Sequence, residues 1–236
     1  MARKKKEYKF KNSIEIEEYV DGRFGAKGKK RKEKKKATPE QVKRQNQLNK
    51  AKNCRRRIKN NFEEDDYYWT LTFKKEQRPE TLNEAKKIWA KLQRKLRDEY
   101  KRQKKKFKWI ILIEKGSRGA MHFHLITNRI ENGDRIMKKL WSYGTIYLRL
   151  LYENGDYKAL ADYMTKESGE GEENHYSHSR NLPIPEPRVK RLKGEWKDIE
   201  PYKGYYIEKE SIAEGINPVT GYKYRHYTMI RINRRI

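Results

Sequence analysis

Two histidines separated by a single residue are the first side chains in this sequence that could do chemistry. His122 and His124 fall in residues 120–126, where the pattern is typical of a β-strand. Successive side chains of a strand point to opposite faces, so both imidazoles share one face and Phe123 points to the other. Two neutral imidazoles placed in this way can ligate one metal ion. The same pattern also fits two polar residues on a solvated face.

The apolar run before the histidines ends in an acid that could be a third ligand. Residues 108–114 read Lys-Trp-Ile-Ile-Leu-Ile-Glu, which predicts a buried strand ending in Glu114. The Gly/Ser turn 115–119 should return the chain antiparallel and bring Glu114 close to His122. Two imidazoles and one carboxylate leave open positions on a divalent ion, which suits Mg²⁺ or Mn²⁺. An ion pair between Glu114 and a lysine is the alternative.

A tyrosine and a lysine further downstream could act on a phosphate. Residues 155–168 predict a short helix, on which Tyr163 and Lys166 are three positions apart and can reach a common point. A phenol has a pKa of about 10, but a nearby cation and a metal-bound phosphate favour attack by the phenolate. Because the chain has 17 tyrosines and 60 basic residues, a helix-surface ion pair between Lys166 and Asp162 is an open alternative.

The composition indicates the class of partner. The 236 residues carry 60 Lys and Arg against 33 Asp and Glu, a formal net charge of +27, and nucleic acid is the natural polyanionic partner. No apolar run approaches the ~20 residues of a transmembrane helix and no signal peptide is visible, so no membrane partner and a cytoplasmic location are expected. A single cysteine, Cys54, is consistent with a reducing compartment.

The charge pattern divides the chain into three parts. Residues 1–60 hold 23 Lys and Arg against 7 acids, which predicts a basic N-terminal arm that is mostly mobile or folds on DNA, with a basic helix over 40–60. Residues 61–182 are expected to form the core domain. Residues 183–236 are expected to be a small C-terminal extension of short helix and hairpin pieces, whose tyrosines could either stack bases or pack a small β element.

The central region alternates between strand and helix patterns and indicates an α+β fold with an antiparallel sheet and helices on one face. The expected strands cover 67–74, 107–114, 120–127 and 145–151, and the expected helices cover 80–104, 131–141 and 155–168.

Together these motifs resemble a known superfamily, the HUH rolling-circle replication initiators. The resemblance covers about residues 67–182 and rests on Trp69–Phe73, Glu114, His122–His124 and Tyr163–Lys166, while Ser177–Pro183 is similar to replication-associated proteins of the filamentous-phage gene II type. Conjugative relaxases of this superfamily carry the tyrosine before the histidines, whereas here it follows them. Many phage initiators have a second tyrosine four residues after the first, but residue 167 here is Glu, so the resemblance implies a one-tyrosine mechanism.

The resemblance implies a fold and a reaction. The fold would be the HUH endonuclease fold, an RRM-like or ferredoxin-like palm with the histidines on a central strand and the tyrosine helix over the exposed sheet face. His122, His124 and Glu114 would hold Mg²⁺ or Mn²⁺ at the scissile phosphate of single-stranded DNA. Tyr163 would attack that phosphate and leave a 5′-phosphotyrosine and a free 3′-hydroxyl. Lys166 would orient the phosphate or help the product state that has lost its metal.

The implied partners follow from the same family. They are a replication origin in single-stranded form and the helicase and DNA polymerase of a bacterial host, since the chain has no Gly-rich lysine loop of a motor protein. A monomer or weak dimer is expected. Two rival hypotheses stay open: a single-tyrosine transposase of the same superfamily, and a non-enzymatic basic protein that binds nucleic acid without cutting it.

Overall fold

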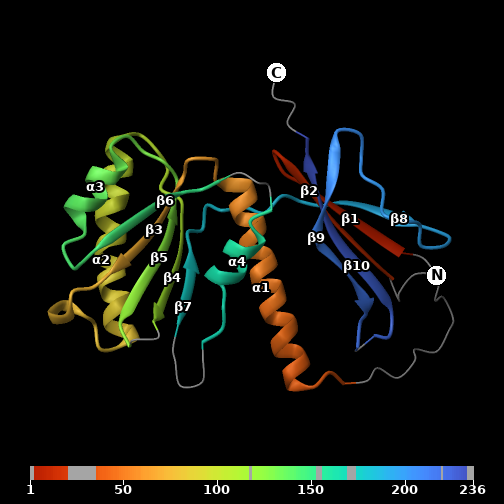
Figure 1. Ribbon diagram of the computed structural model, residues 1–236, viewed down its shortest axis with the longest axis horizontal. Helices are drawn as coiled ribbons and strands as arrows, with labels where there is room; N and C mark the ends of the chain where they lie inside the picture. Colours follow the sequence, from red (N-terminus) through yellow and green to blue (C-terminus); the bar gives the residue numbers. More distant parts are fainter. Residues whose placement is uncertain are drawn as a thin grey trace. The chain divides into compact units, whose positions relative to one another are not determined.

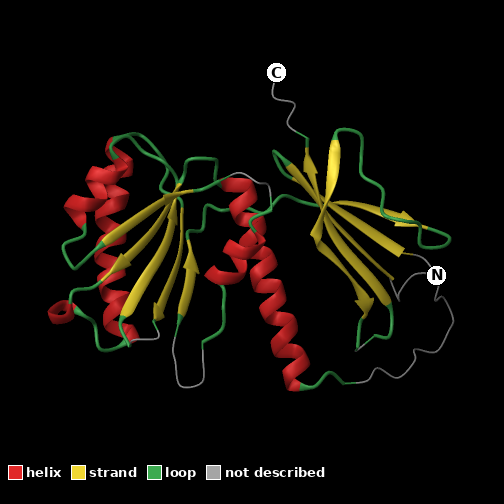
Figure 2. Ribbon diagram, in the orientation of Figure 1, coloured by secondary structure: helices red, strands yellow, loops and turns green. Residues whose placement is uncertain are grey.

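The structure is a computed structural model that describes residues 3–20, 36–116, 119–152, 156–168, 174–218 and 220–232. Over these residues the chain is mixed α+β, with four α-helices, one short 3₁₀ helix and two five-stranded antiparallel sheets (Figures 1 and 2). None of the helices in the described ranges has the length and apolar character needed to cross a bilayer.

The described part of the chain begins with two strands, continues with mixed helices and strands, and ends with four strands. The helices are α1 (Pro39–Asn61), η1 (Lys75–Gln77), α2 (Leu82–Arg102), α3 (Gly133–Leu140) and α4 (Lys158–Met164). The strands are β1 (Arg3–Lys9), β2 (Ser13–Val20), β3 (Tyr67–Thr72), β4 (Trp109–Lys115), β5 (Met121–Thr127), β6 (Ile146–Leu150), β7 (His175–His178), β8 (Arg188–Leu192), β9 (Tyr205–Ile216) and β10 (Lys223–Arg231).

Two compact units divide the chain. The central unit comprises Lys50–Glu153 and Ala159–Pro183, and the terminal unit comprises Met1–Asn49, Asn154–Lys158 and Ile184–Ile236. Each unit contains one of the two sheets (Figure 2).

The sheet of the central unit has the order β6-β3-β5-β4-β7. Helices α2 and α3 lie against one face of it (Figure 1), and α2 contributes a buried stripe of Leu82, Ala85, Trp89, Leu92, Leu96 and Tyr100. This 3–4 spacing is the helical period that the sequence shows. The side chain of Thr81 caps the helix by accepting a hydrogen bond from the backbone N–H of Glu84 at 3.2 Å. The resulting core fixes the sheet that positions the candidate site.

The opposite face of this sheet carries polar side chains. Strand β5 pairs with β3 on one side and β4 on the other, so the two histidines lie on the central strand, as predicted. The alternation of the strands puts Phe123 and Leu125 into the core and leaves His122 and His124 on the other face. Within this unit, the predicted strands and helices are all present, with ends that differ by a few residues.

The sheet of the terminal unit has the order β8-β1-β2-β10-β9 and corrects one prediction. Residues 3–20 were expected to belong to an arm that is mostly mobile or folds on DNA; for these residues the mobile alternative is wrong, because β1 and β2 form an antiparallel hairpin. Strand β2 alternates Ile with Glu over residues 14–17. Ile14 and Ile16 belong to the apolar cluster of this unit, and Glu15 on the other face is buried as well. The lysine-rich run 27–35 lies outside the described residues. The basic helix predicted over 40–60 is confirmed as α1.

The core of the terminal unit is small. Its buried apolar cluster consists of Ile14, Ile16, Tyr227 and Met229, with Ile199, Tyr202, Tyr205 and Ile207 packed against it. Tyr227 is thus a packing residue, whereas Tyr206 and Tyr224 are exposed on their strands. The C-terminal strands β9 and β10 form the predicted hairpin, and β10 also pairs with β2. The short helix that was expected in this extension is wrong, because the described residues after Pro183 form only strands, turns and loops.

Candidate active site

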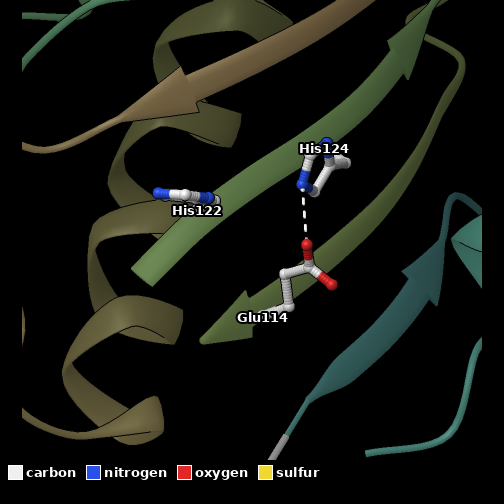
Figure 3. Close-up of side chains that lie close together, drawn as sticks. All are labelled: Glu114, His122 and His124. Carbon is white, nitrogen blue, oxygen red and sulfur yellow. Dashed lines mark hydrogen bonds and ion pairs between the residues drawn. The ribbon is translucent and has the colours of Figure 1, made fainter. Parts of the chain in front are cut away.

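Strand pairing brings the three predicted metal ligands together. Glu114 on β4 is the direct antiparallel partner of His122 on β5, and His124 follows two residues later on the same face. One ligand atom from each of the three side chains lies within 4.8 Å of the others. Figure 3 shows the carboxylate of Glu114 turned toward the imidazole of His124. The prediction that the β4–β5 hairpin brings Glu114 beside the histidines is confirmed.

His124 is held by hydrogen bonds at both ring nitrogens. Its Nε2 lies 3.0 Å from Glu114 Oε1, and its Nδ1 lies 3.1 Å from the Tyr68 hydroxyl and 3.3 Å from that of Thr70. Without a metal, Nε2–H donates to the Glu114 carboxylate, which can only accept. When a cation takes the place of this proton at Nε2, the hydroxyl oxygens of Tyr68 and Thr70 can accept a hydrogen bond from Nδ1–H. Sequence reasoning did not assign Tyr68 and Thr70 this role. Their alternation on β3, in register with His124, is the pattern that could have found them.

His122 is half-buried and tends to be neutral. Burial, together with the nearby charges of His124 and Arg78, lowers the pKa of His122 below its ordinary value, which favours the unprotonated form that a metal requires. The turn after β4 comes close to this ring. A Cβ placed on Gly116 would lie only 3.1 Å from His122 Cε1, so the absence of a side chain at position 116 leaves room for the imidazole.

The hydroxyl of Tyr163 reaches the same cluster from α4. It donates a hydrogen bond to Glu114 Oε1 at 2.8 Å, and it lies 2.9 Å from His124 Nε2. The Tyr163 and His124 rings are nearly perpendicular, with centroids 5.0 Å apart. Burial and the negative charge of Glu114 raise the pKa of Tyr163 above its ordinary value. In this arrangement the phenol is neutral at physiological pH and is aimed at the candidate ligands.

Lys166 also belongs to the cluster, although it does not lie on the helix. Helix α4 ends at Met164, short of the predicted end at residue 168. The Lys166 ammonium lies 2.5 Å from Glu114 Oε2 and 4.6 Å from the centroid of the Tyr163 ring. Its side chain is 43% exposed, so the ammonium can also contact a ligand from solvent. The ion pair of Lys166 is therefore with Glu114.

Glu114 is ionised under all ordinary conditions. Burial alone would raise its pKa, but hydrogen bonds from His124, Lys166 and Tyr163 outweigh burial and lower the pKa to about 2. The cluster therefore combines a permanently negative carboxylate with imidazoles. Such a donor set, two nitrogens and one hard oxygen with open positions, fits a divalent cation such as Mg²⁺ or Mn²⁺. The pairing of Glu114 with Lys166, which the sequence left as an alternative, is also present.

The second histidine pair of the sequence forms no comparable site. His175 and His178 lie at opposite ends of β7. Among the residues that the structure describes, the only group of three or more His, Cys, Asp or Glu side chains placed for a metal is that of Glu114, His122 and His124.

The segment that carries this cluster also matches a known protein family. Residues 66–168 match the family model of the replication-associated proteins of the ORF2 and phage gene II type. The resemblance to gene II-type replication proteins is thus confirmed over this segment. No curated protein and no solved structure matches the chain.

The matched segment contains the whole cluster. It begins just before β3, which carries Tyr68 and Thr70, and ends just after Lys166. The candidate ligands, the half-buried phenol of Tyr163 and the ammonium beside it all come from this one segment of the central unit.

Proposed function

We propose that this chain is a rolling-circle replication initiator that nicks and rejoins single-stranded DNA through a covalent tyrosine intermediate. The observation that carries the proposal is the placement of the Tyr163 hydroxyl within hydrogen-bond distance of both Glu114 and His124. The match to the gene II-type replication-associated family supports the same function, and the charge of +27 supports a nucleic-acid substrate.

His122, His124 and Glu114 are the side chains that would hold the cation. A bound divalent ion would polarise a phosphate oxygen and neutralise charge that develops in the transition state. Tyr68 and Thr70 keep the imidazole of His124 turned so that Nε2 faces the site. The proposal leaves the choice between Mg²⁺ and Mn²⁺ to experiment.

Tyr163 would be the nucleophile. Its Oη attacks the phosphorus in line, the bond from phosphorus to the 3′ oxygen breaks, and the products are a 5′-phosphotyrosine and a free 3′-hydroxyl that has gained a proton. The phenol gives up its own proton, so each bond formed matches a bond broken. Attack of a 3′-hydroxyl on the phosphotyrosine is the reverse step and rejoins the strand.

Lys166 would bring a positive charge to the reacting phosphate. Its ammonium lies over the Tyr163 ring and beside Glu114. An anionic phosphate at Tyr163 would compete with Glu114 for this cation, and Lys166 is exposed enough to turn toward it. The same charge favours the phenolate of Tyr163 over the neutral phenol.

The proposal extends to the fold and the partners. The antiparallel sheet with helices α2 and α3 on one face and the site on the other is consistent with an HUH endonuclease domain over residues 61–182. Replication from the free 3′-hydroxyl would require the origin DNA of the element together with a helicase and a DNA polymerase of the host.

The test is a metal-dependent covalent adduct. The full chain is incubated with fluorescent single-stranded oligonucleotides that tile the origin of its own element, with Mn²⁺ or with EDTA, and resolved on a denaturing gel. The expected result is a labelled protein band that requires Mn²⁺ and is lost in Tyr163→Phe. Tyr152→Phe serves as a matched control, because Tyr152 is 78% exposed and lies outside the cluster.

Two results would overturn the proposal. One is tight DNA binding without any adduct on any origin strand, which would favour the non-enzymatic hypothesis. The other is an adduct that survives Tyr163→Phe at the wild-type rate, which would place the nucleophile elsewhere.

A further inference from the structure

A cavity opens beside the candidate nucleophile, on the side of the sheet edge. It has a volume of about 730 Å³ and is lined by Tyr68, Thr70, His124, Ile146, Tyr147, Leu148, Arg149, Leu160 and Tyr163. All of these residues belong to the central unit. The volume lies within the usual range for sites that hold small molecules. The cavity therefore has room for a ligand next to the atoms that would react.

The outer wall of the cavity is the edge strand β6. Tyr147 pairs with Thr70 and Arg149 pairs with Tyr68 across the β3–β6 ladder. Since Thr70 is in turn the partner of His124 on β5, the side chains of Tyr147 and Arg149 share the face of the candidate site. Strand β6 thus extends the site outward from the metal ligands to the margin of the sheet.

Tyr147 and Arg149 are placed to bind something that the folded chain does not supply. The Tyr147 side chain is 60% exposed and makes no hydrogen bond or ring contact with another described residue. Arg149 is also exposed and makes no ion pair within the described part of the chain. By contrast, Tyr68 at the inner end of the cavity is tied to His124.

The chemistry of the cavity wall matches one nucleotide of a single strand. An exposed aromatic ring offers a stacking surface for a base, and stacking on aromatic side chains accepts any base because every base has a π-face. A guanidinium is well suited to bind the phosphate of the same or the next nucleotide. Leu160 adds apolar surface, and Tyr163 lies at the inner end.

We propose that this cavity is a subsite for the nucleotide that flanks the scissile phosphate, with Tyr147 stacking on its base and Arg149 binding a backbone phosphate. The inference rests on the proposed function and deepens it by naming where the substrate strand lies. Threading the strand over β6 sets the phosphate of the bound nucleotide next to the hydroxyl of Tyr163. The subsite is expected to add affinity without strong sequence choice, because stacking accepts any base and a contact between a guanidinium and a phosphate does not read the base.

The experiment measures DNA binding separately from cleavage. Full-length Tyr163→Phe, which cannot form the adduct, is titrated with fluorescent oligo(dT) over a series of salt concentrations. Adding Tyr147→Ala should weaken binding about tenfold, as expected for the loss of one stacked base, and Tyr147→Phe should restore the affinity. Arg149→Ala should reduce the slope of log Kd against log salt by about 0.7, as expected for one lost single-strand phosphate contact.

Two control substitutions outside the cavity test whether any loss of affinity is specific to the subsite or follows from removing any exposed tyrosine or arginine. Tyr152→Ala removes another exposed tyrosine that lies outside the cavity, and Arg94→Ala removes an exposed arginine of α2, on the other face of the sheet. Both should leave the affinity unchanged. A photocrosslink from 5-iodouracil in the oligo(dT) is expected on the tryptic peptide 140–149, at Tyr147.

The outcomes distinguish the subsite from the function. If wild type forms the adduct but Tyr147→Ala binds like its control and no crosslink reaches β6, the subsite is wrong and the proposed function stands. If Tyr147 binds DNA but no strand is ever cleaved, the proposed function fails while the strand-binding role of β6 survives. The proposed subsite would also be wrong if the β6 edge bound a protein segment and if neither Tyr147→Ala nor Arg149→Ala changed the affinity for oligo(dT).

Discussion

Buried carboxylates occur in both units of this protein, and their partners differ. In the terminal unit, Glu18 is 2% exposed and lies 2.9 Å from the guanidinium of Arg225 and 3.8 Å from that of Arg3. In the central unit, Glu114 is 7% exposed and faces two imidazoles, a phenol and one half-exposed ammonium.

This contrast separates a structural charge cluster from a chemical one. A guanidinium is always charged, so Glu18 has two permanent guanidinium counter-ions, and the ammonium of Lys5 lies 3.8 Å from its other oxygen. Arg3 is further held over the ring of Trp196 at 4.8 Å. When the imidazoles that face Glu114 are neutral, each has a nitrogen lone pair that can bind a cation. The exposed ammonium of Lys166 can leave Glu114 and contact a phosphate. The central cluster thus has capacity for a cation and a phosphate, whereas in the terminal cluster the carboxylate of Glu18 already faces permanent cations.

The largest expected difference comes from removing each carboxylate charge. Glu114→Gln should reduce the rate of adduct formation at least about 100-fold, because even residues behind metal ligands have effects of about 10- to 100-fold. Glu18→Gln should instead lower the free energy of unfolding by about 3–5 kcal/mol, because it leaves the Arg3 and Arg225 charges buried without their partner. Gel assays and urea denaturation measure the two effects. A larger stability loss in Glu114→Gln than in Glu18→Gln would break the comparison.

Removing a hydroxyl that contacts His124 Nδ1 should have a smaller effect, and we expect it to change the affinity for the metal ion only. Tyr68→Phe removes one of the two groups that orient Nδ1, and we expect Mn²⁺ affinity to fall about 10-fold or more. Calorimetric titration with Mn²⁺ measures this change, with Tyr152→Phe as the control. Unchanged Mn²⁺ affinity in Tyr68→Phe would mean that Thr70 alone orients the ring or that His124 is not a ligand.

Acid should remove the contribution of Glu114 to stability. Its folded pKa of about 2 lies below the unfolded value of about 4.3, so the contribution is present above the unfolded pKa and is lost as pH falls through about 2. The stability advantage of wild type over Glu114→Gln should therefore shrink over this range, as measured by thermal melts without metal. An advantage that grows on acidification would contradict the assigned hydrogen bonds.

The smallest expected effect is on the reactivity of the Cys54 thiol. Because this thiol is buried, its reactivity shows whether a variant keeps the fold of the central unit. The thiol is buried in α1, and burial raises its pKa to about 11, against weaker opposing effects of the nearby Tyr176 hydroxyl and Arg57. It should therefore resist thiol reagents at neutral pH in wild type and in Glu114→Gln, and react only in denaturant. Because its folded pKa is raised, its contribution to stability is lost as pH rises toward 11. Fast labelling of native Glu114→Gln would mean that this substitution disturbs the fold.

The site shows what local patterns could and could not predict. The pairing of Glu114 with His122 follows from two strands and a short turn, which are local in sequence, and it was predicted. The contact of Tyr163 with these residues joins distant parts of the chain, and only the family resemblance implied it. The position of Lys166 beyond the end of α4 was missed, because helix ends depend on local caps and packing.

The terminal unit shows why composition misled the prediction. The lysines of residues 3–9 suggested a solvated arm, but their strand is stabilised by β2 and by β8, which is distant in sequence. The alternation of Ile and Glu over residues 14–17 was the local sign of a strand. The pairing of β2 with β10 could not be predicted, because the two strands are far apart in the sequence and no local pattern specifies which residues pair.

The central claim is that Tyr163 becomes covalently attached to DNA, and mass spectrometry of the adduct tests it most directly. The Mn²⁺-dependent adduct is digested with nuclease and trypsin, and the modified peptide is sequenced by fragmentation. The account predicts a nucleotide joined through its 5′ phosphate to the peptide 159–166, in which Tyr163 is the only tyrosine. A nucleotide on Tyr68 or on any other tyrosine, with peptide 159–166 unmodified, would contradict it.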